Sequence, residues 1–374
     1  MRSVAEMRVE RHPAWLVGAV ALLAAALVAR GLDVQLPVAL WGRALLHPDL
    51  DDARQLLVVY SFLPRLAVSL LCGAALALAG TIFQQVMRNP LAEPTTLGVS
   101  AGASLTLTLA LAFAPGLLAY GREWIALIGA AGAVVAVFGL AWGRALAPFA
   151  LVLAGMIVGL YCGAAAAAVQ LFENPYMESF YLWGAGSLSQ QDWSVVLYLL
   201  PRLIAAIGVA VLMTRPLTLL GLKDDGARSM GVSLFGVRLI GLAVAVALSA
   251  FVVAAVGVIG FIGLAGPALV RLAGARRFGS QLLWAPLLGA GLLCVTDQAV
   301  QWVSGGGEEL VPTGAATALL GAPLLLWMLP RLRAGAEPLG ATGRELVRRS
   351  RRAWGKVLIA LAVPSVLVLI SLHL

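Results

Sequence analysis

Long apolar stretches separated by short polar segments follow one another along most of the chain. They lie near residues 14–30, 66–86, 97–117, 124–142, 149–171, 193–213, 281–303 and 311–329. Each is close to the roughly 20 residues that a helix needs to cross a bilayer. The stretch from Trp124 to Trp142 has no charged residue, whereas the strands of a transmembrane barrel alternate polar and apolar residues. The pattern therefore predicts a bundle of transmembrane helices.

One further apolar stretch, 239–270, is too long for a single crossing. As one helix it would measure about 48 Å, against a hydrocarbon core of roughly 30 Å. Residues that break helices interrupt it at Gly257, Gly260, Gly263, Gly266 and Pro267. We therefore predict two helices joined by a tight turn near Gly257, which brings the total to about ten spans. The segment 214–238 before them is too polar to cross a membrane and is predicted to be a surface loop.

Composition and charge agree with a membrane protein. Of the 374 residues, 61% are hydrophobic and only 12% are charged, compared with about 25% charged in soluble domains. The net charge of +8 is spread over short loops, which indicates the positive-inside rule rather than nucleic-acid binding. With the N-terminus inside, the 26 Lys and Arg residues all fall on the inner side except Arg30, Arg43, Arg54, Arg65, Arg122 and Arg202.

Motifs for catalysis and for metal binding are missing from the sequence. No GxxxxGK[ST] motif is present, and the only lysines are Lys223 and Lys356, so we expect ATP hydrolysis to be carried out by another chain. The three histidines lie far apart, and the three cysteines have no CxxC spacing. We therefore predict no catalytic residue, no metal site and no cofactor. The scarcity of charge within the spans argues against an ATP-independent secondary carrier, which remains an alternative, as does a membrane scaffold that transports nothing.

Several motifs occur in order along the chain: Leu63-Pro64-Arg65, the Gly73 to Gly80 stretch, Arg88-Asn89-Pro90-Leu91-Ala92-Glu93-Pro94, Leu97-Gly98-Val99-Ser100-Ala101-Gly102, Gly260-Phe261-Ile262-Gly263, and Pro312-x-Gly314-x-x-Thr317-Ala318-x-x-Gly321-Ala322-Pro323. Together they resemble the permease subunits of iron-siderophore and cobalamin ABC importers, most of all the N-terminal half of a fused ferric hydroxamate permease. The resemblance covers about residues 14–333. It implies the all-α fold of a type II ABC importer permease.

The resemblance also implies a function and partners. The expected substrate is a ferric siderophore, with the hydroxamate type favoured and with cobalamin or haem as alternatives. Expected partners are a dimer of ABC ATPases that holds ATP and Mg, a periplasmic or lipid-anchored substrate-binding protein, a second permease half, and membrane lipid. The protein is expected in the cytoplasmic membrane, with its N-terminus in the cytoplasm.

Three groups of residues receive roles from the resemblance. A loop that couples to the ATPase is expected at Lys223, Asp224, Asp225, Ala227, Arg228, Ser229, Met230 and Gly231, although an ordinary solvated loop would explain it without the family. Arg65 is expected to dock the binding protein, or else to snorkel at the membrane surface. Phe62 and Gln301 stand where further docking arginines are common, so docking is expected to rely on Arg65 with Arg54 or Arg122, or on the other half of the transporter. A cytoplasmic gate is expected at Ala147, Pro148 and Phe149.

The sequence also predicts which glycines pack helices together and how the chain is divided into segments. Glycines let helix backbones approach closely in lipid, and we predict packing contacts at Gly73, Gly80, Gly98, Gly102, Gly314 and Gly321. We divide the chain into a permease half over 1–333, a basic cytoplasmic linker over 334–356, and an extra transmembrane helix over 357–374. That helix resembles the first helix of a second permease half, so the sequence is interpreted as a truncated or split fused permease or as a complete subunit.

Overall fold

The computed structural model describes residues 12–49, 51–142, 148–170, 184–221, 233–304 and 311–333, and within them the chain forms helices and no strands. Seven helical segments are long and apolar enough to cross a membrane: α1 (Pro13–Gln35), the continuous segment Ala53–Met87, α6 (Arg122–Trp142), α7 (Pro148–Gln170), α9 (Ser194–Leu212), α12 (Leu234–Val256) and α14 (Phe278–Val303). Two shorter apolar helices are α5 (Val99–Phe113) and α13 (Ile262–Leu272), and α15 (Thr313–Arg333) has a shorter apolar part over Thr313–Met328. The predicted all-α transmembrane fold is confirmed.

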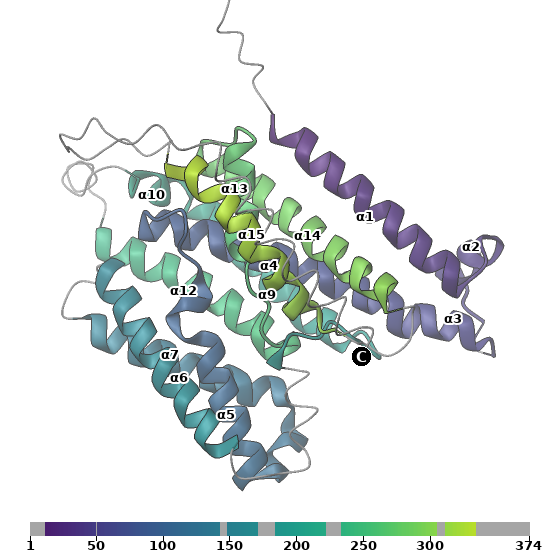
Figure 1. Ribbon diagram of the computed structural model, residues 1–374, viewed down its shortest axis with the longest axis horizontal. Helices are drawn as coiled ribbons and strands as arrows, with labels where there is room; N and C mark the ends of the chain where they lie inside the picture. Colours follow the sequence, from purple (N-terminus) through teal and green to yellow (C-terminus); the bar gives the residue numbers. More distant parts are fainter. Residues whose placement is uncertain are drawn as a thin grey trace, which may run out of the picture.

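Helix α4 (Leu63–Met87) lies at the centre of the bundle, where it packs against α14, α12, α13 and α9. Most of its side chains are buried, including Leu78, Ile82 and Phe83. In Figure 1, α1 runs beside α14 along one edge of the bundle, and α5, α6 and α7 form a separate layer on another side. The exposed side chains of α1 and α7 are mostly apolar, as expected for helices that face lipid.

The break in the long apolar stretch lies where the sequence predicts it. Helix α12 ends at Val256, and Gly257 follows with φ of 80°, a conformation that glycine adopts without steric cost. Helix α13 begins only at Ile262 and has 11 residues, so it measures about 16 Å and covers about half of the hydrocarbon core. The hairpin therefore joins one complete span to a half-span.

Two predicted boundaries are wrong. The segment 214–238 is not a loop throughout, because α10 (Thr214–Leu219) occupies its beginning and α12 starts at Leu234. Burial of Leu217 and a hydrogen bond from the Gly236 N–H to Ser233 Oγ (3.4 Å) stabilise these helical ends. The predicted span 97–117 is shorter than expected: α5 ends at Phe113, and a 3₁₀ turn, η4 (Pro115–Tyr120), follows the proline.

The segment before α4 contains helices that hydropathy does not reveal. Helix α2 (Val38–Leu46) is followed by α3 (Ala53–Leu57) and by a π-helical turn, η2 (Val58–Phe62), that continues into α4. The side chain of Asp52 begins α3 by accepting hydrogen bonds from the Arg54 N–H (3.0 Å) and from Gln55 Nε2 (3.0 Å). The hydrogen bond from Gln55 and then the one from Arg54 hold the pKa of Asp52 below its ordinary value.

Candidate functional site

A buried ion pair joins three helices at one end of the bundle. Arg65 on α4 is 8% exposed, and Asp297 on α14 is fully buried. The guanidinium donates to the carboxylate through Nη2 (2.7 Å to Oδ1) and Nε (3.1 Å to each oxygen). Gln301 Nε2 donates to Oδ2 (2.7 Å), and Thr313 Oγ1, at the start of α15, donates to Oδ1 (2.9 Å). The carboxylate therefore fixes the ends of α4, α14 and α15 relative to one another.

This geometry bears on the docking role expected for Arg65. The guanidinium faces Asp297 inside the bundle, and Gln301, in a position where an arginine was expected, donates to the same carboxylate. Docking by Arg65 stays a prediction, and the structure adds a role in holding helices together. Sequence reasoning named Arg65 and Gln301 separately. The signal that would have connected them is Asp297, an acidic residue inside an apolar span, which requires a partner there.

A second carboxylate, which is partly buried, contacts the break between α12 and α13. After Met87 the chain turns back through Arg88, and a short 3₁₀ turn, η3 (Pro94–Leu97), leads into α5. Just before η3, Glu93 Oε1 accepts a hydrogen bond (3.0 Å) from the backbone N–H of Phe261, the residue that precedes α13. Phe261 has φ of 75°, which is uncommon for a residue with a side chain. Glu93 therefore accepts a hydrogen bond from one of the N–H groups that the N-terminal end of α13 leaves without a partner in its own helix.

Removing this carboxylate should loosen the half-span. We expect Glu93→Ala to lower the free energy of unfolding by about 1.5–3 kcal/mol, the range for a hydrogen bond to a charged group. Glu93→Gln keeps an oxygen acceptor at the same place and should retain most of the stability. The measurement is thermal unfolding of the purified chain in detergent. Equal losses in the two variants would contradict the capping role.

The glycines predicted to pack helices lie close to other elements, and all except Gly321 lie against backbone atoms. A Cβ on Gly73 would collide with the Gly289 carbonyl and would lie 2.9 Å from the Ala290 Cα. Gly80 lies in the same way against Gly263, Gly102 against Gly129, Gly314 against Val258, and Gly321 against the Phe261 ring, while Gly98, with φ of 77°, lies against Gly159. These contacts join α4 to α14 and α13, and α5 to α6 and α7.

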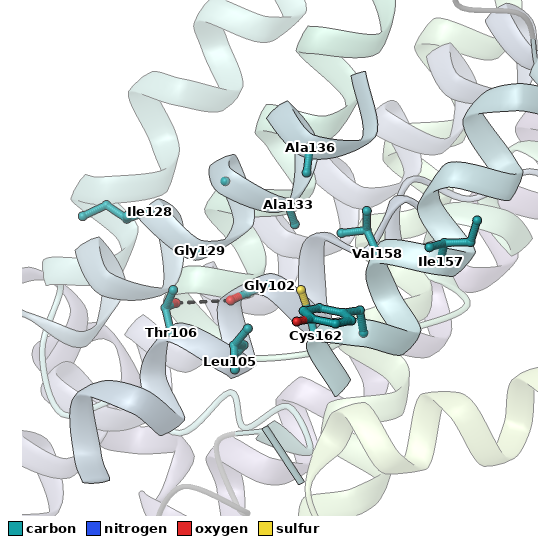
Figure 2. Close-up of a pocket in the computed structure, with 12 residues that line it drawn as sticks. Gly102, Leu105, Thr106, Ile128, Gly129, Ala133, Ala136, Ile157, Val158 and Cys162 are labelled. Atoms are coloured by element: carbon teal, nitrogen blue, oxygen red, sulfur yellow. Dashed lines mark hydrogen bonds between the residues drawn. The ribbon is translucent and has the colours of Figure 1, made fainter. Parts of the chain in front are cut away.

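An apolar groove of about 500 Å³ lies where α5, α6 and α7 meet. Figure 2 shows its walls, with Gly102, Leu105 and Thr106 on one side and Ala133, Ala136 and Val158 on the others. The Thr106 hydroxyl lies within hydrogen-bonding distance of the Gly102 carbonyl on its own helix (3.2 Å) and of the Ile125 carbonyl on α6 (3.0 Å), so backbone oxygens already engage it. The lining residues are uncharged, and this groove offers no group that would hold a charged substrate.

Several expected sites fall outside the described residues. They are the coupling loop from Lys223 to Gly231, Ala147 of the gate, the linker 334–356 and the extra helix 357–374. Phe149 is described at the start of α7, where it is 77% exposed. The roles of the coupling loop and of the gate stay predictions.

Relatives that are named as import permeases match most of the chain. It is 46% identical over 350 residues to the iron(3+)-hydroxamate import system permease protein FhuB of Salmonella typhimurium, covering 93% of this chain and 51% of that protein. It is 36% identical over 302 residues to the hemin transport system permease protein HmuU of Yersinia pestis, covering 78% and 88%. The chain thus spans about half the length of the FhuB proteins of S. typhimurium and Escherichia coli, at 51% and 50%.

A solved structure agrees with these sequences. The bundle superposes on an inward-facing metal-chelate type ABC transporter with a TM-score of 0.72 and 27% identity, covering 84% of this chain and 99% of the solved one. The match to the FecCD transport family extends over residues 19–331, from α1 into α15. On this evidence, the chain is a multi-pass membrane protein that belongs to the FecCD transport family.

Proposed function

We propose that this chain is a transmembrane permease half of an ATP-driven importer of ferric siderophores of the hydroxamate type. The observation that carries the proposal is its 46% identity to a hydroxamate permease over 93% of its length. The corresponding identity to a hemin permease is 36%, so haem is the second candidate substrate. Because the chain spans half the length of its FhuB relatives, the complete importer needs a second permease half.

Import requires energy that this chain does not provide. Without a phosphate-binding loop, it depends on a dimer of ATPase subunits that hold ATP and Mg, and on a binding protein that delivers the substrate. The loop from Lys223 to Gly231 would contact the ATPases on the cytoplasmic side of the inner membrane, where the N-terminus also lies. Closure of the ATPases would then reach the helices as a rigid-body shift.

Hydrogen bonds between helices connect the parts of the bundle that such a shift would move together. Asp297 connects α4, α14 and α15, and Glu93 connects the segment between α4 and α5 to the start of α13. A displacement applied at one end of these helices would therefore be carried along them rather than lost in local bending. This supports a permease that moves as connected blocks.

Uptake into proteoliposomes tests the substrate. The chain would be purified from its native membrane with its bound subunits, reconstituted, and given the binding protein and a radioiron-loaded hydroxamate siderophore. We expect uptake that requires ATP inside the vesicles and that haem and cobalamin do not inhibit. Uptake without ATP would favour a secondary carrier, and competition by haem would favour the second candidate substrate.

A charge reversal in the predicted coupling loop tests the coupling. We expect Arg228→Glu to reduce ATP-dependent uptake at least about tenfold, because an interface arginine is turned into a repulsive charge. The complex should still assemble, which co-purification of the ATPase would show. Arg43→Glu, an exposed substitution on α2 on the predicted opposite face, serves as the control and should transport normally. Normal uptake by Arg228→Glu would refute the coupling role.

A further inference from the structure

A cavity of about 510 Å³ lies between the last turns of α1 and α14. Its lining comes from those two helices only: Leu27, Arg30, Gly31, Val34, Gln35, Gln298, Gln301 and Trp302. Arg30 is the one charged side chain in this lining. Neither the docking residue Arg65 nor the predicted coupling loop takes part. The cavity is therefore separate from the sites considered above.

Three polar side chains around this cavity make no hydrogen bond to the described part of the chain. Gln298 is 4% exposed, yet within the described part of the chain its amide makes no hydrogen bond. The same holds, among the described residues, for the Gln35 amide and for the guanidinium of Arg30. Gln35 is partly buried and Arg30 is exposed. All three groups border the cavity without a hydrogen-bond partner among the described residues, and they favour a ligand that accepts hydrogen bonds.

The position of Arg30 also favours an anionic ligand. Its guanidinium lies over the ring of Trp302, 4.7 Å from the ring centre, and this contact leaves the N–H groups at its edges available. Gln301 donates one N–H to Asp297 (2.7 Å), and that carboxylate is already neutralised by Arg65. The lining therefore presents one net positive charge and several amide donors.

The surroundings of the cavity indicate a lipid. Helix α1 runs along the edge of the bundle beside α14 (Figure 1), and its exposed side chains include Leu22, Leu23 and Val34. Tryptophan and arginine at the end of a span lie at the depth of lipid headgroups. Leu27 lies about one turn from Arg30, toward the middle of α1. Polar groups at headgroup depth with apolar ones below them match the two parts of a phospholipid.

We propose that this cavity binds an anionic phospholipid, whose phosphate is held by Arg30, Gln298 and Gln35 and whose acyl chain lies along Leu27. An anionic headgroup is preferred over a choline headgroup because choline would place a second positive charge beside Arg30. The proposal does not depend on what the permease transports. Its test measures lipid binding alone.

Native mass spectrometry of the purified, delipidated chain tests the proposal. We expect one phosphatidylglycerol to bind more tightly than phosphatidylcholine, and Arg30→Gln to weaken that binding about tenfold, equivalent to one charged hydrogen bond. Arg122→Gln, an exposed arginine on α6 away from the cavity, is the matched control and should bind normally. Equal binding by Arg30→Gln and the wild type would overturn the proposal, as would equal losses in the two variants.

Two further measurements distinguish the source and the place of the ligand. Inorganic phosphate should not displace phosphatidylglycerol; displacement would show a site for free anions and overturn the lipid assignment. In phosphatidylcholine vesicles with a minor fraction of brominated phosphatidylglycerol, we expect the emission of Trp302 to be quenched more than that of Trp124, which is exposed on α6. The variants Trp302→Phe and Trp124→Phe identify how much of the tryptophan emission comes from each of the two residues. Equal quenching would place the lipid elsewhere and overturn the proposal.

Discussion

Asp297→Ala is expected to destabilise the folded chain by roughly 3–5 kcal/mol, because it leaves the charge of Arg65 buried without its partner. The substitution also removes the acceptor for Gln301 and Thr313, so the ends of α14 and α15 should separate. Thermal unfolding in detergent, followed by tryptophan emission, measures the loss. Transport should fall with it, because the three helices would no longer move as one block.

The same chain offers a matched control and a rescue for this prediction. Arg43 and Asp49 form an ion pair at 3.4 Å whose side chains are 62% and 37% exposed, and Arg43→Ala should change stability by less than about 1 kcal/mol. The double variant Arg65→Leu, Asp297→Leu removes both charges and should recover much of the loss. A double variant as unstable as Asp297→Ala would show that the hydrogen bonds to Gln301 and Thr313, rather than the uncompensated charge, dominate.

Gly73→Ala should also reduce stability strongly, by about 3 kcal/mol, at the upper end of the cost of overpacking. The added methyl group meets the backbone of α14 at Gly289 and Ala290, and backbone atoms cannot move aside as the end of a flexible side chain would. Helix α4 is the centre of the bundle, so its separation from α14 affects most of the core. The measurement is again thermal unfolding of the purified chain.

Gly139→Ala is the control for this prediction. Gly139 lies within α6, and no atom lies within 4 Å of the position that its Cβ would take. Alanine there should stabilise the helix by about 0.5–1 kcal/mol, since it lowers the entropy of the unfolded chain. If both variants lost the same stability, the cost would belong to glycine replacement in general and not to the contact between α4 and α14.

Much of the fold follows from local features of the sequence. Hydropathy locates the spans because the cost of exposing polar groups to lipid acts on each segment separately. Glycine and proline likewise locate the break at Gly257. Helices α2 and α3 are missed because their positions depend on a capping aspartate and on packing, not on a long apolar run.

The candidate sites likewise divide into features that the sequence predicts and features that depend on tertiary packing. The sequence by itself determined the class of fold, the order of the spans, the glycines at close contacts and the resemblance to importer permeases. Only the tertiary structure decided that Arg65 pairs with Asp297, 232 residues away, that Glu93 caps α13, and that Arg30 and Gln298 face one cavity. The reason is physical: a span is selected by its own transfer free energy, whereas the partner of a buried polar group depends on how separate helices pack.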